Sequence, residues 1–215
     1  MIHQSSRPTY QALKRKILDG DLPFGEPITV KALESEIGFS AIPIREALIA
    51  LSAEDLIDFF PGRGFFTKHL EAEGMSQRLD LLHNLLEISV RTLPDGRQAA
   101  LRRHLRTDSE NLRHMRGTLY DNVALLTDIF DTYFLPPTAI LARNSITQCA
   151  RFLAFDFKLH QTRATLGRIA FSYLWLASTD QRRRLHRELA AFFNVRKARI
   201  PRTIRAMNDR FLIST

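Results

Sequence analysis

The chain has a single cysteine and no long apolar run, so it lacks the features that would indicate a disulfide-rich secreted protein or a membrane protein. Only one of its 215 residues, Cys149, is a cysteine, so no internal disulfide can form and a reducing compartment fits. No apolar run approaches the roughly 20 residues that span a bilayer. The N-terminal residues also lack the apolar core of a secretory signal. We therefore expect a cytoplasmic protein without a membrane partner, in which Cys149 is a buried and unreactive thiol.

Sequence motifs of common enzymes are absent as well. The chain contains no Gly-rich phosphate loop, no Gly-x-Ser-x-Gly elbow, no Cys-x-x-Cys and no His-Glu-x-x-His. Its seven histidines are scattered along the sequence without a tight cluster. We therefore predict that the protein is not an enzyme and carries no cofactor.

The positive charge is unevenly distributed. The net charge is +8, yet residues 1–70 hold eight Lys and Arg against nine Asp and Glu. Most of the excess follows Gln181, where ten basic residues accompany only Glu188 and Asp209. A solvated helix face explains such a basic tail better than phosphate contact does, so the charge alone does not locate a DNA surface.

The most informative run extends from Gly38 to Leu48. Gly38 suits the left-handed residue that ends a helix, and Ser40 is a natural N-cap for the next one. Pro43 falls in the first turn, where a missing N–H does no harm, and Arg45 lies on the outward face. An inward apolar stripe has helical spacing: Ile44, Leu48 and Leu51. These residues fit the recognition element of a helix-turn-helix, or an ordinary corner between two helices.

The flanking sequence favours the first interpretation. An apolar face at Tyr10, Leu13 and Ile17 predicts a helix that ends near Gly20, and Thr29 caps a second short helix after the extended pair at residues 27–28. Two apolar strands, at residues 56–60 and 65–68, surround a Pro-Gly-Arg-Gly turn with Arg63 at its tip. Three helices and a hairpin with a basic tip predict a winged helix-turn-helix at residues 7–70.

The order and wording of these motifs resemble the N-terminal domain of GntR-type transcriptional regulators. The matching runs are Leu22-Pro23-Phe24-Gly25, Ser40-x-x-Pro43-Ile44-Arg45-Glu46-Ala47-Leu48 and the wing Gly62-Arg63-Gly64. The resemblance implies a sequence-specific regulator that binds double-stranded operator DNA as a homodimer. The DNA-contacting positions that it implies are Lys31, Ser40, Ala41, Ile42, Pro43, Arg45, Arg63 and Gly64.

Two positions depart from the family pattern. Ala41 stands where members usually carry a DNA-contacting arginine, and Asp55 replaces a common glycine before Leu56. The first departure puts affinity or site choice in doubt, and the second predicts a less regular turn into the wing. Together with the near-neutral N-terminal segment, Ala41 leaves open a winged-helix interaction module that does not bind DNA.

The remaining sequence reads as helical almost throughout. Amphipathic segments are expected at residues 79–90, 101–115, 123–134, 140–162, 167–178, 180–193 and 198–213. Short connections between them predict an antiparallel all-helical bundle at residues 75–215, after a short linker near Lys68–Met75. The protein is therefore expected to be mainly α.

This second half resembles the helical effector domain called FCD, on residues 81–91 and on the last two predicted helices. The resemblance implies dimerisation and a small carboxylate effector held with a divalent metal by an Asp-x-x-x-His pair and two later histidines. By spacing, three of the metal-ligand positions correspond to Asp131, His186 and Asn208. The fourth position, a histidine in the family, is occupied by Leu135. His83 stands where the family often has an arginine that binds the carboxylate of the effector. We therefore expect His83, Asp131, His186 and Asn208 to bind a small anionic metabolite without a metal.

An alternative pairing uses Asp156 and His160. In residue identity this pair matches the Asp-x-x-x-His motif better than Asp131 and Leu135 do, and its i,i+4 spacing places both side chains on one helix face. Its spacing to the neighbouring helices is wrong for the family, so a surface ion pair is the expected role. If Asp156, His160 and His186 instead met in the fold, the protein could be a metal-dependent helical enzyme.

Overall fold

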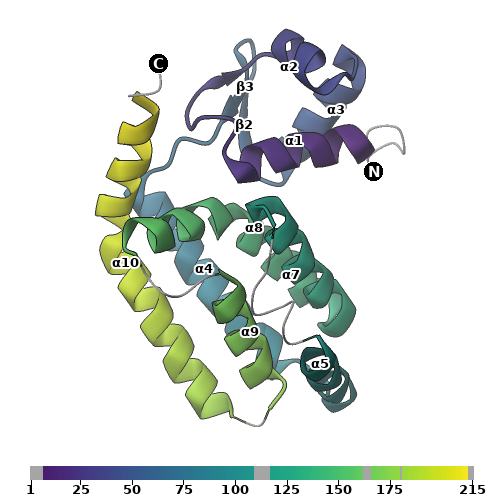
Figure 1. Ribbon diagram of the computed structural model, residues 1–215, viewed down its shortest axis with the longest axis vertical. Helices are drawn as coiled ribbons and strands as arrows, with labels where there is room; N and C mark the ends of the chain where they lie inside the picture. The colour runs from purple at the N-terminus through teal and green to yellow at the C-terminus, as the bar shows by residue number, and fades with distance from the viewer. Residues whose placement is uncertain (1–6, 109–116, 162–165, 180, 213–215) are drawn as a thin grey trace. The chain divides into compact units, whose positions relative to one another are not determined.

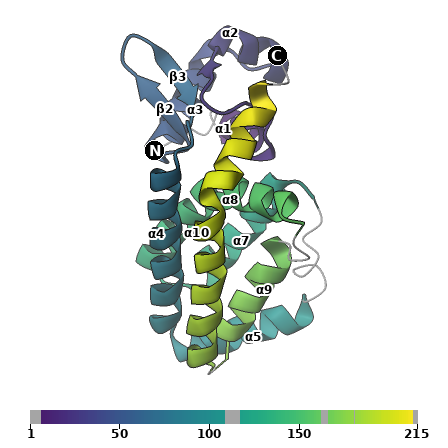
Figure 2. The ribbon, with the colours of Figure 1, turned by 90° about the vertical axis from the view of Figure 1, so that its left-hand side faces the viewer.

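A computed structural model describes residues 7–108, 117–161, 166–179 and 181–212 (Figures 1 and 2). The chain divides into two compact units: residues up to Leu70 with those from Asn208 onward, and Glu71–Met207. The predicted class is confirmed, because a winged helix-turn-helix precedes an antiparallel helical bundle. No helix within the described ranges is long and apolar enough to cross a membrane.

The first unit combines three helices with a small antiparallel sheet. Its elements are α1 (Arg7–Asp19), β1 (Pro27–Ile28), α2 (Val30–Ile37), α3 (Ala41–Ala53), β2 (Ile57–Phe60) and β3 (Gly64–Thr67). The strand order is β1-β3-β2, with Ile28 opposite Phe65 and Asp58 opposite Phe66. The wing hairpin turns at Gly62, whose φ of +77° suits glycine, as the sequence predicted.

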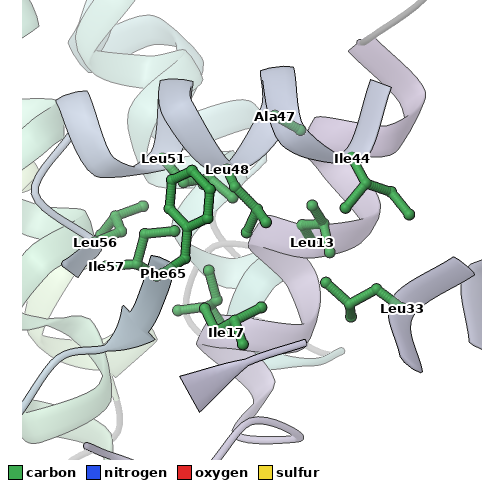
Figure 3. Packing of buried hydrophobic residues seen from close by; sticks show 11 residues of the cluster. Leu13, Ile17, Leu33, Ile44, Ala47, Leu48, Leu51, Leu56, Ile57 and Phe65 are labelled. Carbon is green, nitrogen blue, oxygen red and sulfur yellow. The ribbon is translucent and has the colours of Figure 1, made fainter. Parts of the chain in front are cut away.

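The core of this unit lies between the inner faces of the helices and the sheet (Figure 3). The stripe predicted for the third helix is buried, with Ile44, Leu48 and Leu51 all at 0% exposure. They pack with residues from α1, α2 and the wing: Leu13, Ile17, Leu33, Leu56, Ile57 and Phe65. A polar contact joins α1 to the end of α3, because Lys14 Nζ donates to Glu54 Oε2 at 2.9 Å. The orientation of α3 is therefore fixed from within the unit.

Asp55 shows why glycine is common at its position. Its φ is +58°, in the left-handed region that L-residues other than Asn and Asp rarely adopt. The Asp55 carboxylate pairs with the ammonium of Lys68, which also donates to Asp58 Oδ1 at 2.5 Å. Burial alone would lower the pKa of Lys68, but these hydrogen bonds outweigh it and the pKa is raised. The strained turn is thus tied to the second strand of the wing.

Within the described residues, the regular structure of the second unit is helical throughout. The described ones are α4 (Ala72–Arg91), α5 (Asp95–Thr107), α7 (Leu119–Tyr133), α8 (Pro136–Leu159), α9 (Leu166–Ala177) and most of α10 (Arg182–Leu212). Helices α4 and α10 lie side by side (Figure 2), and they are antiparallel because Asp80 pairs with Lys197 while Glu87 pairs with His186. The helix predicted at residues 101–115 corresponds to α5, and its expected last part, with Leu112 and Met115, lies outside the described residues.

The prediction of two final helices, at residues 180–193 and 198–213, was wrong. α10 is one helix of 31 residues with Pro201 inside it. A proline in a helix interior removes one backbone hydrogen bond. The buried stripe nevertheless continues across it, through Leu189, Phe193 and Ile200 to Ile204. Burial on both sides of Pro201 accounts for a helix that local propensity would have ended.

Two other expectations for the bundle are met. The proline pair expected to interrupt the helical pattern lies at the start of α8, where the missing N–H groups need no partner. Cys149 is fully buried in α8, and burial raises the pKa of its thiol to about 12. A thiol with so high a pKa is a weak nucleophile near neutral pH.

Leu48→Ala should strongly destabilise the first unit, because Leu48 is fully buried and its truncation leaves a cavity. We expect a loss of about 2–5 kcal/mol in the free energy of unfolding, measured by denaturant titration. Ile49→Ala is the matched control, because Ile49 is the next residue of α3 and is 61% exposed. Equal destabilisation by the two substitutions would contradict the described orientation of α3.

Candidate functional site

The turn between α2 and α3 presents the N-terminus of α3 to solvent. Gly38 ends α2 with φ of +72°, and its N–H donates to the Glu34 carbonyl at 3.1 Å. Ser40 takes the N-cap position with extended backbone, as predicted, but its hydroxyl makes no capping hydrogen bond. The start of α3 therefore offers a hydroxyl and helix N-terminal N–H groups to an anion such as phosphate.

One face of α3 carries an exposed stripe of unusual composition. Ile42, Arg45 and Ile49 follow i, i+3, i+7 spacing, so they share one side of the helix. All three are exposed, and Ile42 is 72% exposed. A cation flanked by two aliphatic side chains can meet both a hydrogen-bond acceptor and a methyl group on base edges. Ala41 and Pro43 beside this stripe are half-buried.

The wing places a second cation on the same unit. Arg63 lies at the tip of the β2–β3 hairpin, before Gly64, and its side chain is exposed. Its guanidinium lies over the rings of Phe60 and Phe66, at 5.8 and 5.4 Å from their centroids. Stacking of this kind holds the side chain extended while its N–H groups remain able to contact phosphate.

The basic residues of this unit fall into two groups. Lys14 is bound to Glu54, and Lys16 lies 3.1 Å from Glu36 Oε2, so both contribute to ion pairs inside the unit. Lys31 near the start of α2, Arg45 on α3 and Arg63 on the wing are exposed. Of the five basic residues named here, Lys31, Arg45 and Arg63 are therefore the ones best suited to DNA contact.

In the bundle, the structure brings together two of the four residues expected to bind an effector. Glu87 Oε1 lies 2.6 Å from His186 Nδ1 of α10 and 3.2 Å from His83 Nε2 of α4. Only the first contact is aligned as a hydrogen bond, and the His83 ring stacks on Phe193 at 4.9 Å. Glu87 was missed from the sequence, although its i+4 spacing from His83 was a usable signal.

The other two expected residues lie elsewhere. Asp131, at the end of α7, is exposed and pairs with Arg143 Nη1 of α8 at 3.1 Å. Asn208 follows His186 by 22 residues within α10, which corresponds to about 33 Å of helix. His83, Asp131, His186 and Asn208 therefore do not form one site in this structure, because α10 is continuous where two helices were expected.

Asp156 and His160 form a buried cluster, so the expectation of a surface ion pair was wrong. Asp156 is 0% exposed and accepts a hydrogen bond from Thr203 Oγ1 at 3.0 Å, while His160 Nε2 lies 3.5 Å from the same carboxylate. Arg196 and Arg199 approach its other oxygen at 3.7 and 3.9 Å. The carboxylate thus supplies a counter-charge that the two guanidinium groups share within the bundle.

This cluster does not include His186, so the metal-enzyme constellation is also not assembled. His186 precedes Thr203, which contacts both Asp156 and His160, by 17 residues, or about 25 Å along α10. Among the described residues, no group of three or more His, Cys, Asp and Glu side chains is arranged to hold a metal ion. The residues present therefore do not fit the divalent metal that the FCD resemblance implies.

An apolar cavity of about 70 Å³ lies within the bundle. Its walls come from five helices and include Leu86 of α4, Phe130 of α7, Phe157 of α8, Tyr173 of α9 and Phe192 of α10. The Tyr173 hydroxyl donates to the Leu86 carbonyl at 3.0 Å, and burial raises its pKa, so it stays neutral. Sequence patterns could not predict this cavity, because residues far apart in the chain line it.

Comparison with known proteins agrees with this architecture. Residues 6–67 match the family described as bacterial regulatory proteins, gntR family. The whole fold is similar to a transcriptional regulator of the GntR type from Rhodococcus sp. RHA1, with TM-score 0.63 and 16% identity, over 91% of this chain and 97% of that one. It is also similar to E. coli McbR/YncC, with TM-score 0.55 and 16% identity, over 96% and 98%. No curated protein in the comparison matches the sequence.

Purified without added metal, the protein is expected to carry no stoichiometric transition metal, because tight sites usually need three or four protein ligands. Elemental analysis measures this, and chelator should leave the unfolding transition unchanged. About one metal per chain would contradict the prediction. Loss of that metal in His160→Ala but not in Asp131→Ala would then assign it to the Asp156–His160 pair.

Proposed function

We propose that this chain, whose residues 6–67 form a DNA-binding domain of the GntR family, is a cytoplasmic transcriptional regulator and not an enzyme. The observation that carries the proposal is the exposed face of α3, where Ile42 and Arg45 lie on a helix whose opposite side is fixed in the core. A recognition helix needs this combination, because its outer side chains must reach base edges in a defined orientation.

In this proposal α3 enters the major groove of operator DNA. Arg45 contacts base edges, and Ser40 with the first turn of α3 contacts phosphate. Lys31 and the wing residues Arg63 and Gly64 contact the flanking backbone. The regulator acts as a homodimer, so two copies of α3 meet half-sites about 34–36 Å apart.

The helical unit is proposed to dimerise the protein and to bind a small effector. The resemblance of residues 81–91 to the FCD domain and the cavity inside the bundle support this assignment. An effector that favours one spacing of the two recognition helices would change operator affinity by the 1–3 kcal/mol typical of allosteric coupling, or about 5- to 150-fold. The anionic effector expected from the sequence is not what this cavity favours, because the described residues that line it supply no counter-charge.

A winged-helix interaction module without DNA binding is the second candidate. Two observations favour it: Ala41 replaces the arginine usual in the family, and Lys14 and Lys16 are engaged in ion pairs. Selection of bound sequences from a random DNA pool separates the two candidates. Enrichment of a defined sequence supports the regulator, and no enrichment at low salt supports the interaction module.

Arg45→Ala should cost about 1–3 kcal/mol of affinity for the selected operator and relax specificity at one base pair, because a bidentate contact to guanine would be lost. Mobility shift with the operator and its single-base variants measures both effects. Lys31→Ala is the matched comparison. As a phosphate contact, it should weaken all sequences alike and reduce the salt slope by about 1. Unchanged operator binding by a folded Arg45→Ala protein would contradict the assigned role of Arg45.

Ile42 should read the methyl group of a thymine. A 72% exposed aliphatic side chain at the start of a recognition helix has a natural partner in the thymine C5-methyl group. Replacing the contacted thymine by uracil removes only that methyl. We expect wild-type binding to weaken about fourfold, which corresponds to about 0.8 kcal/mol for one buried methylene-sized group.

The test is a double-mutant cycle between protein and DNA. In Ile42→Ala the same uracil substitution should have little further effect, whereas in Ile49→Ala it should still weaken binding as in the wild type. Ile49 is a suitable control because it is equally apolar and exposed but lies two turns farther along α3. If no uracil substitution within the half-site affects wild-type binding, Ile42 does not read thymine.

A further inference from the structure

We infer that the cavity in the helical bundle binds a small, neutral, apolar molecule, and not the carboxylate that the domain resemblance implies. Its role as the effector site rests on the proposed function, whereas the binding itself does not. The cavity lies within residues 82–193 and so belongs to the second unit alone. The thirteen described residues that line it have aliphatic or aromatic side chains, and the Tyr173 hydroxyl is the one polar group among them.

Among the described residues that line the cavity, no side chain is placed to pair with an anion. The Tyr173 hydroxyl already donates to the Leu86 carbonyl, so it is not a free donor. Tyr173 stacks on Phe130 with centroids 6.1 Å apart, which continues the apolar wall. Burying a carboxylate among such groups without a hydrogen bond or counter-ion is strongly unfavourable. A neutral apolar molecule is instead stabilised by removal of its surface from water.

Charged or polar groups that pack against two of the cavity walls already lie beside groups of the bundle. Arg196 lies over the rings of Phe192 and Phe157, at 4.1 and 5.1 Å from their centroids, and both rings line the cavity. Burial lowers the pKa of Arg196, while the charge of Asp156 opposes that shift, so the cation faces a carboxylate already buried beside it. On another wall, His83 stacks on Phe193 and lies near Glu87.

Size and shape narrow the ligand further. At about 70 Å³ the cavity is roughly half the volume of an engineered apolar cavity of about 150 Å³ that binds benzene. Without movement of the walls it therefore holds a few carbon atoms, and with side-chain rotation it holds at most one ring. Five of the lining side chains are aromatic: Phe130, Phe157, Tyr173, Phe192 and Phe193. Edge contacts from these rings favour a flat, unsaturated ligand.

The test compares benzene and toluene with benzoate, which adds a carboxylate to the same ring. The full-length protein is heated with each probe, and unfolding is followed by circular dichroism. Benzene or toluene at tenfold excess over Kd should raise Tm by about 3 °C, and benzoate should not. No shift with either neutral probe, or an equal shift with benzoate, would overturn the inference.

Ala170→Leu localises the binding. Ala170 lines the cavity on α9, so the larger side chain should fill the space, raise Tm without any probe and abolish the benzene shift. Ser172→Leu places the same side chain on the exposed side of α9 and should keep the benzene shift. Ala170→Val is the milder substitution if Ala170→Leu fails to fold. A benzene shift retained in a folded filled variant would place the ligand elsewhere and overturn the inference.

A mobility shift with the selected operator separates this inference from the proposed function. If benzene binds the wild type but not Ala170→Leu, the site stands whether or not the protein binds DNA. If the protein also binds DNA and the neutral probe changes operator affinity at least fivefold, the cavity is the effector site. Unchanged operator affinity at saturating probe would overturn the effector role while leaving the binding site in place.

Discussion

Burial of the inner face of α3 is the constraint on which the DNA-binding surface depends. Ile44, Leu48 and Leu51 are completely buried against α1, α2 and the wing strands, so α3 cannot rotate without opening the core. That packing determines which side chains point outward, and it selects Ile42, Arg45 and Ile49. The stability of the unit and the orientation of its reading face therefore come from the same side chains.

The helical unit depends in the same way on the continuity of α10. Because this helix is continuous across residues 194–197, where a break was expected, it carries both His186, beside Glu87, and Arg196, beside Asp156, along one axis. The polar groups are thereby divided into two clusters, each with its own counter-charges. Between the helices remains a cavity with apolar walls. This arrangement separates charge from the ligand space, unlike a carboxylate site that places cations in the pocket.

The sequence predicted the first unit closely because local chemistry sets its boundaries. Gly38, Ser40 and Gly62 each fix a turn through their own backbone preferences, and these elements lie within a residue or two of their predicted ends. Asp55 was expected to stand at a glycine position of the family pattern, and its φ of +58° is a backbone conformation that glycine adopts without strain. The ion pairs of Lys14 and Lys16 could not be foreseen, because their partners depend on how the helices pack.

For the second unit, the sequence predicted most of the helices but not which residues come together in a site. The prediction ended one helix at residue 193 and began the next at residue 198, although the buried stripe through Phe193, Ile200 and Ile204 continues at helical spacing and was the signal to follow. That error placed His186 and Asn208 in separate helices, which could have folded back on each other and brought the two side chains into one predicted site. Burial of Asp156 was equally beyond the sequence, because its partner Thr203 lies 47 residues away. Sites assembled from distant helices require the tertiary structure.

The central claim is that α3 reads operator DNA as one of a pair of recognition helices in a homodimer. Hydroxyl-radical footprinting on the sequence selected from random DNA tests it most directly, because the protected sugars report where each helix lies. We expect two related half-sites with centres about 10 base pairs or a multiple of one helical turn apart, and loss of both footprints in Arg45→Ala. A single unpaired footprint, or a paired one that survives Arg45→Ala in folded protein, would contradict the account.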